Sequence, residues 1–289
     1  MPRLVRVRGR RSSSPSPFST DYTTNVLPRL VERRPTAGAP VLTGKLLIKQ
    51  LHMRYRQDAP PVLRGVNLEI PAGTKVAVVG RTGAGKSSLF LALQRLYTFT
   101  GVVIVDDAIN IQKDSLQNVR DIYSYVPQDP ILYQGTIRNN LIQGMALEEL
   151  PSERLLWSAL ERVSMATKVR EWPDQLETKI LSQGENLSAG ERQLLCLARA
   201  LLRRARILLV DEGMSSVDER TERVAHDTLL SLSGCTVLSI CHNLGSLHRF
   251  DYVVVMDGGR VAEHGTPSLL MNGQDEQPGV ILRELVSKS

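Results

Sequence analysis

A glycine-rich segment has the residue types needed to bind phosphate groups: Gly80-Arg81-Thr82-Gly83-Ala84-Gly85-Lys86-Ser87, followed by Ser88. Its spacing is G-x-x-x-x-G-K-S, and it lies between a buried strand expected over 75–79 and a helix expected over 87–96. Glycines let backbone N–H groups surround phosphate oxygens, and a helix start adds the positive end of its dipole. The segment therefore predicts a site for a nucleoside triphosphate. Lys86 would reach the β and γ phosphates, and the Ser87 hydroxyl would ligate Mg²⁺.

A second segment offers two carboxylates at the end of an apolar strand. Ile207–Val210 is followed by Asp211 and Glu212. Asp211 would hold Mg²⁺ through its water shell, and Glu212 would orient and polarise an attacking water, because phosphoryl transfer depends mainly on positioning and charge compensation. By itself the pattern is more often a strand that meets a turn. The phosphate-binding segment upstream is what gives it meaning.

A helix start just before the acidic strand carries a third motif: Leu187-Ser188-Ala189-Gly190-Glu191-Arg192-Gln193. The alternative is an ordinary capped amphipathic helix, expected here over 189–204. The motif resembles the signature of the ABC transporter family, which usually reads Leu-Ser-Gly-Gly-Gln. A serine and bare backbone at a helix start form an anion site. The resemblance implies that Ser188 and Gly190 contact the γ-phosphate of ATP held by an opposite cassette.

The other motifs of that family follow in order. Gln128 resembles the glutamine that touches Mg²⁺ and water and couples to the membrane domain. His242 resembles the histidine at the γ-phosphate, against the alternative of a core histidine. Ser215-Ser-Val-Asp218 resembles the loop that crosses the dimer interface. Tyr55 resembles the aromatic residue that stacks on adenine, although a tyrosine in a strand is usually a packing residue. The resemblance implies ATP and Mg²⁺ as ligands.

Five longer stretches lie at 53–57, 62–66, 80–89, 126–138 and 185–188. They resemble the C subfamily, which includes the multidrug-resistance-associated exporters, and this resemblance runs from about residue 41 to the end of the chain. Such transporters carry two unlike cassettes, of which the second keeps the glutamate but has an altered signature. The chain therefore resembles a second cassette. It departs from the family at Glu191, which brings a carboxylate near a bound nucleotide, at Gly213-Met214, and at Asn243.

The order of apolar segments predicts an α/β fold. Leu46–Leu51 and Val62–Ile70 alternate like half-exposed antiparallel strands, whereas Thr236–Ile240 reads as a buried strand and Glu153–Val163 as a helix. The resemblance implies a P-loop NTPase (RecA-like) core with an antiparallel β subdomain and an inserted α-helical subdomain that carries the signature. We expect a cassette over residues 41–289, with the helical subdomain at about 129–204.

Charge and composition narrow the function. Residues 1–40 hold eight arginines and two acidic residues, which accounts for the whole net charge of +6, so the basic balance does not indicate nucleic-acid binding. We expect this segment to be disordered; its Arg- and Ser-rich start also fits a mitochondrial transit peptide. No apolar run approaches the ~20 residues of a membrane-spanning helix. Three cysteines at no metal-ligand spacing fit a reducing compartment.

The sequence therefore predicts an ATPase cassette that powers export. It would work at the cytoplasmic face of a membrane, with a second cassette and the transmembrane domains of an exporter as partners. The alternatives are a cassette fragment or regulatory protein that binds ATP with little turnover, and a soluble ABC ATPase that works on DNA or ribosomes. Neither the transported substrate nor the membrane can be read from these residues.

Overall fold

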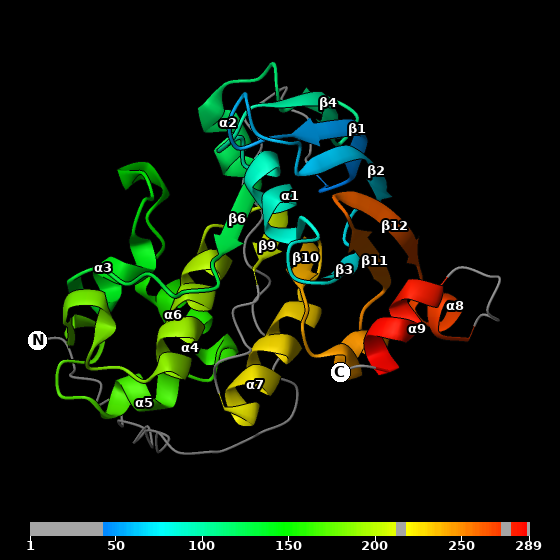
Figure 1. The fold of residues 1–289 in the computed structure, drawn as a ribbon. Coiled ribbons are helices and arrows are strands. Elements are labelled where there is room, and N and C mark those ends of the chain that lie inside the picture. The colour runs from blue at the N-terminus through cyan, green and yellow to red at the C-terminus, as the bar shows by residue number, and fades with distance from the viewer. Residues whose placement is uncertain (1–42, 212–217, 273–278, 288–289) are drawn as a thin grey trace, which may run out of the picture. The chain divides into compact units, whose positions relative to one another are not determined.

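The computed structural model describes residues 43–211, 218–272 and 279–287, all within one compact unit. The basic segment 1–40, Glu212 and the departures at Gly213-Met214 lie outside these residues. Figure 1 shows the arrangement of the elements.

A six-stranded sheet forms the centre of this unit, in the order β12-β11-β3-β10-β9-β6. All neighbours are parallel except β11 and β12. The strands are β3 (Lys75–Val79), β6 (Tyr123–Val126), β9 (Ile207–Val210), β10 (Thr236–Ile240), β11 (Tyr252–Asp257) and β12 (Arg260–Gly265). Parallel strands need crossover connections, and helices supply them here.

Alternation along the central strands divides their side chains between separate cores. Val76 and Val78 of β3 pack into the core beneath the antiparallel sheet, whereas Ala77 and Val79 pack against the C-terminal helices. Both sets are fully buried. Because side chains point to opposite faces at every second residue, a strand covered on both faces must be apolar throughout. This is why β3 is apolar from residue 76 to residue 79.

A separate four-stranded antiparallel sheet has the order β2-β1-β4-β5. Its strands are β1 (Leu46–Met53), β2 (Leu63–Ile70), β4 (Phe99–Val105) and β5 (Ile109–Asn110). On β2, buried and exposed residues alternate almost strictly, as expected of a sheet with one face in water. The β1–β4 pairing shifts its register by one residue between Lys49 and His52, which is a β-bulge.

An internal helical region lies between β6 and β9 in the chain. It contains α3 (Ile137–Ile142), α4 (Glu153–Arg162), α5 (Ala166–Glu171) and α6 (Ala189–Leu202), with the short strands β7 (Gly135–Thr136) and β8 (Lys179–Ile180). Three short 3-10 helices lie between these elements, at Leu147–Glu149, Gln175–Glu177 and Ser182–Gly184. The buried face of α6 packs on α3 and α4 and extends the same core to β9. This is the helical subdomain that the fold prediction required.

The remaining helices cover the central sheet (Figure 1). They are α1 (Lys86–Leu93), α2 (Leu116–Ile122), α7 (Glu219–Leu230), α8 (Pro267–Asn272) and α9 (Val280–Ser287), with a 3-10 helix at Leu244–Arg249. Helix α1 is buried in the core under the antiparallel sheet, while α8 and α9 pack on the other face through Leu270 and Leu282. In the described part of the chain, no helix combines the length and apolarity needed to cross a membrane.

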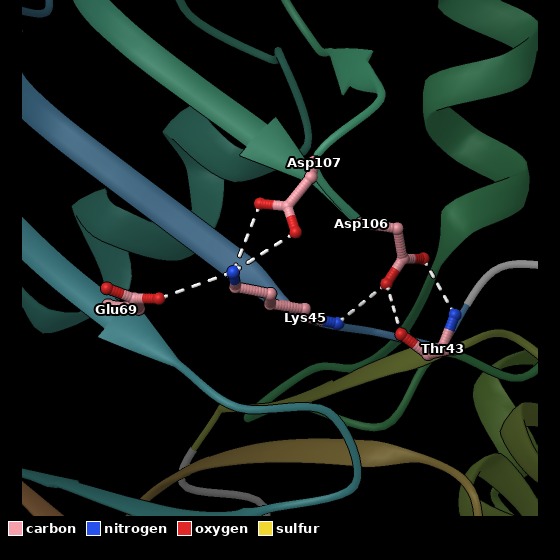
Figure 2. A network of polar contacts seen from close by, with 5 residues as sticks. All are labelled: Thr43, Lys45, Glu69, Asp106 and Asp107. Atoms are coloured by element: carbon pink, nitrogen blue, oxygen red, sulfur yellow. Dashed lines mark hydrogen bonds and ion pairs between the residues drawn. The ribbon is translucent and has the colours of Figure 1, made fainter.

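A polar clamp joins the start of β1 to the turn after β4 (Figure 2). The Asp106 carboxylate accepts hydrogen bonds from the N–H groups of Thr43, Gly44 and Lys45 at 2.8, 3.2 and 2.9 Å, and from the Thr43 hydroxyl at 2.6 Å. The Lys45 ammonium lies 3.1 Å from Asp107. The clamp fixes the first described residues to a turn about 60 positions further along the chain.

These elements confirm the predicted fold class of an α/β P-loop core with an antiparallel sheet and an inserted helical region. The strands 75–79, 207–210 and 236–240 begin and end at the predicted residues. The helix predicted over 87–96 is shorter, because Arg95 has a left-handed backbone (φ 52°) and the helix ends at Leu93. The helix predicted over 189–204 likewise ends at Leu202, before Arg204 with φ 51°.

Candidate nucleotide-binding site

Four of the motif segments follow adjacent strands of the central sheet at the same edge. Gly80 follows β3, His242 comes two residues after β10, Asp211 follows β9, and Gln128 comes two residues after β6. The Asp211 N–H donates to the carbonyl of Val126 at 2.9 Å, so the ends of β6 and β9 are level. The carboxyl ends of parallel strands are where α/β folds bind ligands. Sheet order thus brings together residues up to 162 positions apart.

The phosphate-binding segment is a tight loop between β3 and α1. Gly83 and Gly85 have φ of +81° and +100°, values that favour glycine, and Gly85 is the residue before α1. The Lys86 side chain is buried and its ammonium donates to the carbonyls of Gly80 at 2.7 Å and Arg81 at 3.2 Å. The ammonium therefore lies inside the curve of the loop. Arg81 and Thr82 are exposed, whereas Ala84 is buried.

A chain of hydrogen bonds links this loop to the acidic strand. The Ser87 hydroxyl donates to one oxygen of the Asp211 carboxylate at 3.1 Å, and the Tyr125 hydroxyl donates to the other at 3.1 Å. Asp211 is 6% exposed. Burial, together with Asp211, raises the pKa of Tyr125 well above its ordinary value, so this hydroxyl remains a donor. Sequence reasoning missed Tyr125, because a tyrosine within a strand carries no motif.

The candidate base-stacking residue lies beside the start of α1. The Tyr55 hydroxyl is 2.7 Å from the hydroxyl oxygen of Ser88. Tyr55 is 43% exposed, and its ring meets the ring of Tyr97 edge to face, with centroids 4.9 Å apart and planes at 88°. Tyr97 is a second exposed aromatic residue at the site that sequence reasoning missed. The signal that could have found it is its place in the strand register, which the bare sequence does not display.

Gln128 and His242 are both exposed at the carboxyl edge of the sheet. Cys241, the neighbour of His242, is buried, and burial raises the pKa of its thiol to about 12. Burial therefore keeps the Cys241 thiol in its neutral form near neutral pH. Among the described residues, no cluster of three or more His, Cys, Asp or Glu side chains could hold a metal ion.

The signature segment begins α6 with a reciprocal cap. The Ser188 side chain accepts from the N–H of Glu191 at 3.2 Å, and the Glu191 carboxylate accepts from the N–H of Ser188 at 2.9 Å. The same carboxylate forms an ion pair with Lys168 of α5. Partial burial works to raise the pKa of Glu191, but the hydrogen bonds from Lys168 and Ser188 outweigh it and hold the pKa below its usual value. The carboxylate expected near a nucleotide is thus engaged within its own chain.

Gly190 packs closely against the start of α7. A Cβ atom at Gly190 would lie 3.0 Å from the Thr221 hydroxyl and 3.4 Å from the Asp218 carboxylate. Asp218 caps α7, because its carboxylate accepts from the N–H and the hydroxyl of Thr221 at 3.0 and 2.7 Å. The signature and the last residue of the predicted interface loop therefore touch in one chain. The rest of that loop, with Glu212, lies outside the described residues.

Sequence comparisons with known proteins all match one family of transporters. The family model described as ABC transporter matches residues 63–215. A probable multidrug resistance-associated protein from Drosophila melanogaster is 41% identical over 85% of this chain, and a multidrug resistance protein from Leishmania tarentolae is 40% identical over 81%. ABC transporter C family member 12 from Dictyostelium discoideum is 39% identical over 84%.

The chain spans only 15–18% of the length of these three relatives. A solved structure of a bacterial Atm1-family ABC exporter with ATP bound superposes with a TM-score of 0.77 at 30% identity. That match covers 88% of this chain and 44% of the exporter chain. The similarity thus runs through nearly the whole described unit.

Proposed function

Since the chain belongs to the ABC transporter family and is an ATP-binding cassette of its C-subfamily type, we propose that it hydrolyses ATP to drive export through a membrane-spanning partner. The observation that carries the proposal is the bond between the Ser87 hydroxyl and the Asp211 carboxylate. It joins the phosphate-binding loop to the acidic strand across a sheet edge where Gln128 and His242 also lie.

Lys86 and the loop would bind the phosphates. The Lys86 ammonium donates to two neutral backbone carbonyls, and anionic phosphate oxygens would be stronger acceptors. Helix α1 directs the N–H groups of its first turn, and the positive end of its dipole, toward the same place. Ser88 holds the Tyr55 hydroxyl, so the base would lie on the Tyr55 side of the loop.

The Ser87 and Asp211 oxygens fit a Mg²⁺ ion. Ser87 would ligate the ion directly and Asp211 would hold it through a bound water, because Mg²⁺ dehydrates reluctantly and usually keeps several waters. The two side-chain oxygens lie 3.1 Å apart. Mg²⁺ is commonly held by one or two protein oxygens plus substrate phosphates and waters, so a larger acidic cluster is not required. The bound ion would neutralise charge on the transferred phosphate, with Gln128 as a further ligand.

Glu212 would be the general base, with His242 at the γ-phosphate. Asp211 is the first residue after β9 at the sheet edge, and Glu212 is the next residue in the sequence. Hydrolysis needs a group that orients and polarises the attacking water, and a carboxylate next to the ion supplies it.

The partners would be a second cassette and transmembrane domains. The start of α6, with Ser188 and Gly190, would face the γ-phosphate of ATP held by the second cassette in a head-to-tail pair, with this chain as the unlike second cassette. A cavity of about 320 Å³ between the core and the helical region is lined by Pro127, Ile131 and Tyr133, close to Gln128. Ile131 and Tyr133 are 55% and 49% exposed. This surface would contact the membrane partner at the cytoplasmic face.

Glu212→Gln tests the proposal. The variant should bind Mg-ATP like the unaltered chain and lose turnover, because an amide keeps the size but cannot take up the proton of the water. ATP binding by equilibrium dialysis and phosphate release are measured in parallel, with a cassette bearing Leu-Ser-Gly-Gly-Gln present. Glu219→Gln, on the exposed start of α7, is the matched control. Unchanged hydrolysis in Glu212→Gln would move the base elsewhere, and no hydrolysis by the unaltered pair would favour a regulatory ATP-binding role.

A further inference from the structure

Tyr55 and Tyr97 each lie two residues beyond the end of the pairing between β1 and β4. At the end of this ladder His52 pairs with Thr100 and Met53 with Phe99. Continuing the same register by two residues brings Tyr55 opposite Tyr97. The two rings are in contact at this end of the ladder, and their planes meet at 88°. Their centroids are 4.9 Å apart.

A β-bulge sets this register. Lys49 pairs with Val102, and the register then shifts by one residue before His52. Within the shift, Gln50 and Gly101 have φ of +50° and +102°, and a Cβ atom at Gly101 would lie 2.2 Å from the Gln50 carbonyl oxygen. Without the shift, Leu96 would stand opposite Tyr55, because a one-residue slip exchanges the two faces of a strand. The bulge therefore gives Tyr55 an aromatic partner.

The Tyr55 ring is also held at its far end. Its hydroxyl is 2.7 Å from the hydroxyl of Ser88, which is only 6% exposed and lies two residues after Lys86 on α1. The ring is thus fixed at one end by the phosphate-binding helix and along its side by Tyr97. Both rings remain partly open to solvent, at 43% for Tyr55 and 39% for Tyr97.

We propose that Tyr97 is a positioning residue for base recognition: it orients the Tyr55 ring, and Tyr55 alone stacks on the purine of a bound nucleotide. This inference rests on the proposed nucleotide-binding function. A free tyrosine ring would lose rotamer freedom on stacking, whereas a ring already oriented gives up less, so the base binds more tightly. Removal of one such edge-to-face contact corresponds to about a three- to ten-fold loss in affinity.

The test compares two probes that share the phosphates but not the base, Mg-ATP and magnesium tripolyphosphate. Their affinities are measured by calorimetry for Tyr97→Ala, Tyr97→Phe, Tyr55→Ala and the double alanine variant, with Leu96→Ala as the matched control in the same segment. Tyr97→Ala should weaken Mg-ATP about three- to ten-fold and leave tripolyphosphate unchanged. Tyr97→Phe should bind both probes like the unaltered chain, because phenylalanine keeps the ring.

The double variant separates positioning from direct contact. If Tyr97 acts through Tyr55, adding Tyr97→Ala to Tyr55→Ala should cause no further loss of Mg-ATP affinity. A further loss would mean that Tyr97 touches the base, which overturns the inference. Equal losses for both probes, or unchanged Mg-ATP affinity in Tyr97→Ala, would also overturn it. Failure of the proposed function would give a different result, because Lys86→Ala would then leave the binding of both probes unchanged.

Discussion

Replacing Glu191 should expose how much the altered signature contributes to the stability of α6. Its carboxylate accepts the Ser188 N–H at 2.9 Å and forms an ion pair with Lys168. The Glu191 side chain is 17% exposed and that of Lys168 49%. Glutamine can keep the cap through its amide oxygen but loses the ion pair and the favourable charge at the helix start. Alanine loses all three interactions.

The geometry sets the size of each effect. The hydrogen bond from the Ser188 N–H to the Glu191 carboxylate contributes about 1 kcal/mol, a partly exposed ion pair about 0.5 kcal/mol and a carboxylate at a helix start about 0.5 kcal/mol. We therefore expect Glu191→Gln to lower the free energy of unfolding by about 1 kcal/mol, and Glu191→Ala by about 2 kcal/mol. Lys168→Met should cost about 0.5 kcal/mol, and nothing further in the Glu191→Gln background.

The assay is urea unfolding followed by circular dichroism from pH 3 to 7, with Glu185→Gln as the exposed control. Because the pKa of Glu191 is lowered in the folded chain, its contribution is present above the ordinary glutamate pKa of about 4.3 and is lost as pH falls through the folded pKa. The difference in free energy of unfolding between Glu191→Gln and the unaltered chain should be constant from pH 7 to about 5 and disappear below about 4. A gap independent of pH would refute the reasoning.

Three further predictions concern other parts of the site. Gly80→Ala should lower the free energy of unfolding by about 3 kcal/mol or more, because the new Cβ atom would lie 2.2 Å from a backbone oxygen of β11. Gly83→Ala should lower it by only about 1–2 kcal/mol, because a Cβ atom there meets nothing within 4 Å and only the backbone is strained. Equal urea midpoints for the two variants would contradict this. Tyr125→Phe should lower the free energy of unfolding by about 1.5–3 kcal/mol through its lost bond to Asp211, and an unchanged midpoint would show that the bond is dispensable. The Cys241 thiol, with its pKa raised to about 12, should resist iodoacetamide at pH 8 until urea unfolds the chain, as mass spectrometry would report; rapid labelling of the folded chain would contradict its burial.

Much of the fold could be predicted because its signals are local. Continuous apolar runs ending in polar residues marked β3, β9 and β10, and sheet order then placed their ends at one edge. The ends of the helices were harder to predict. Helices α1 and α6 end just before Arg95 and Arg204, which have left-handed backbones, and an arginine in the sequence does not indicate that conformation. Element type therefore follows from periodicity, whereas termination depends on backbone conformations that many residues can adopt.

The parts of the site that the sequence could not predict depend on tertiary contacts. Tyr125 reaches Asp211 because β6 and β9 are neighbours, and Tyr97 meets Tyr55 just beyond the end of the β1–β4 pairing. The substitution at Glu191 suggested a repulsive charge, but Lys168 comes from α5, 23 residues earlier, and pairs with it. Motif spacing fixes the identity of a site, and the groups that orient its side chains come from packing.

The clamp at Asp106 has a mechanical consequence (Figure 2). It fastens one end of the β1–β4 ladder, and the pair of Tyr55 and Tyr97 lies at the other end. The eight residues of β1 between them span about 26 Å of nearly inextensible strand. A pull on the chain ahead of Thr43 would load the four hydrogen bonds of this clamp together with the bond that the Thr236 hydroxyl of β10 donates to the Gly44 carbonyl at 2.7 Å. The load would therefore reach the central sheet as well as β1, and along β1 it would be carried toward the two aromatic rings beside α1.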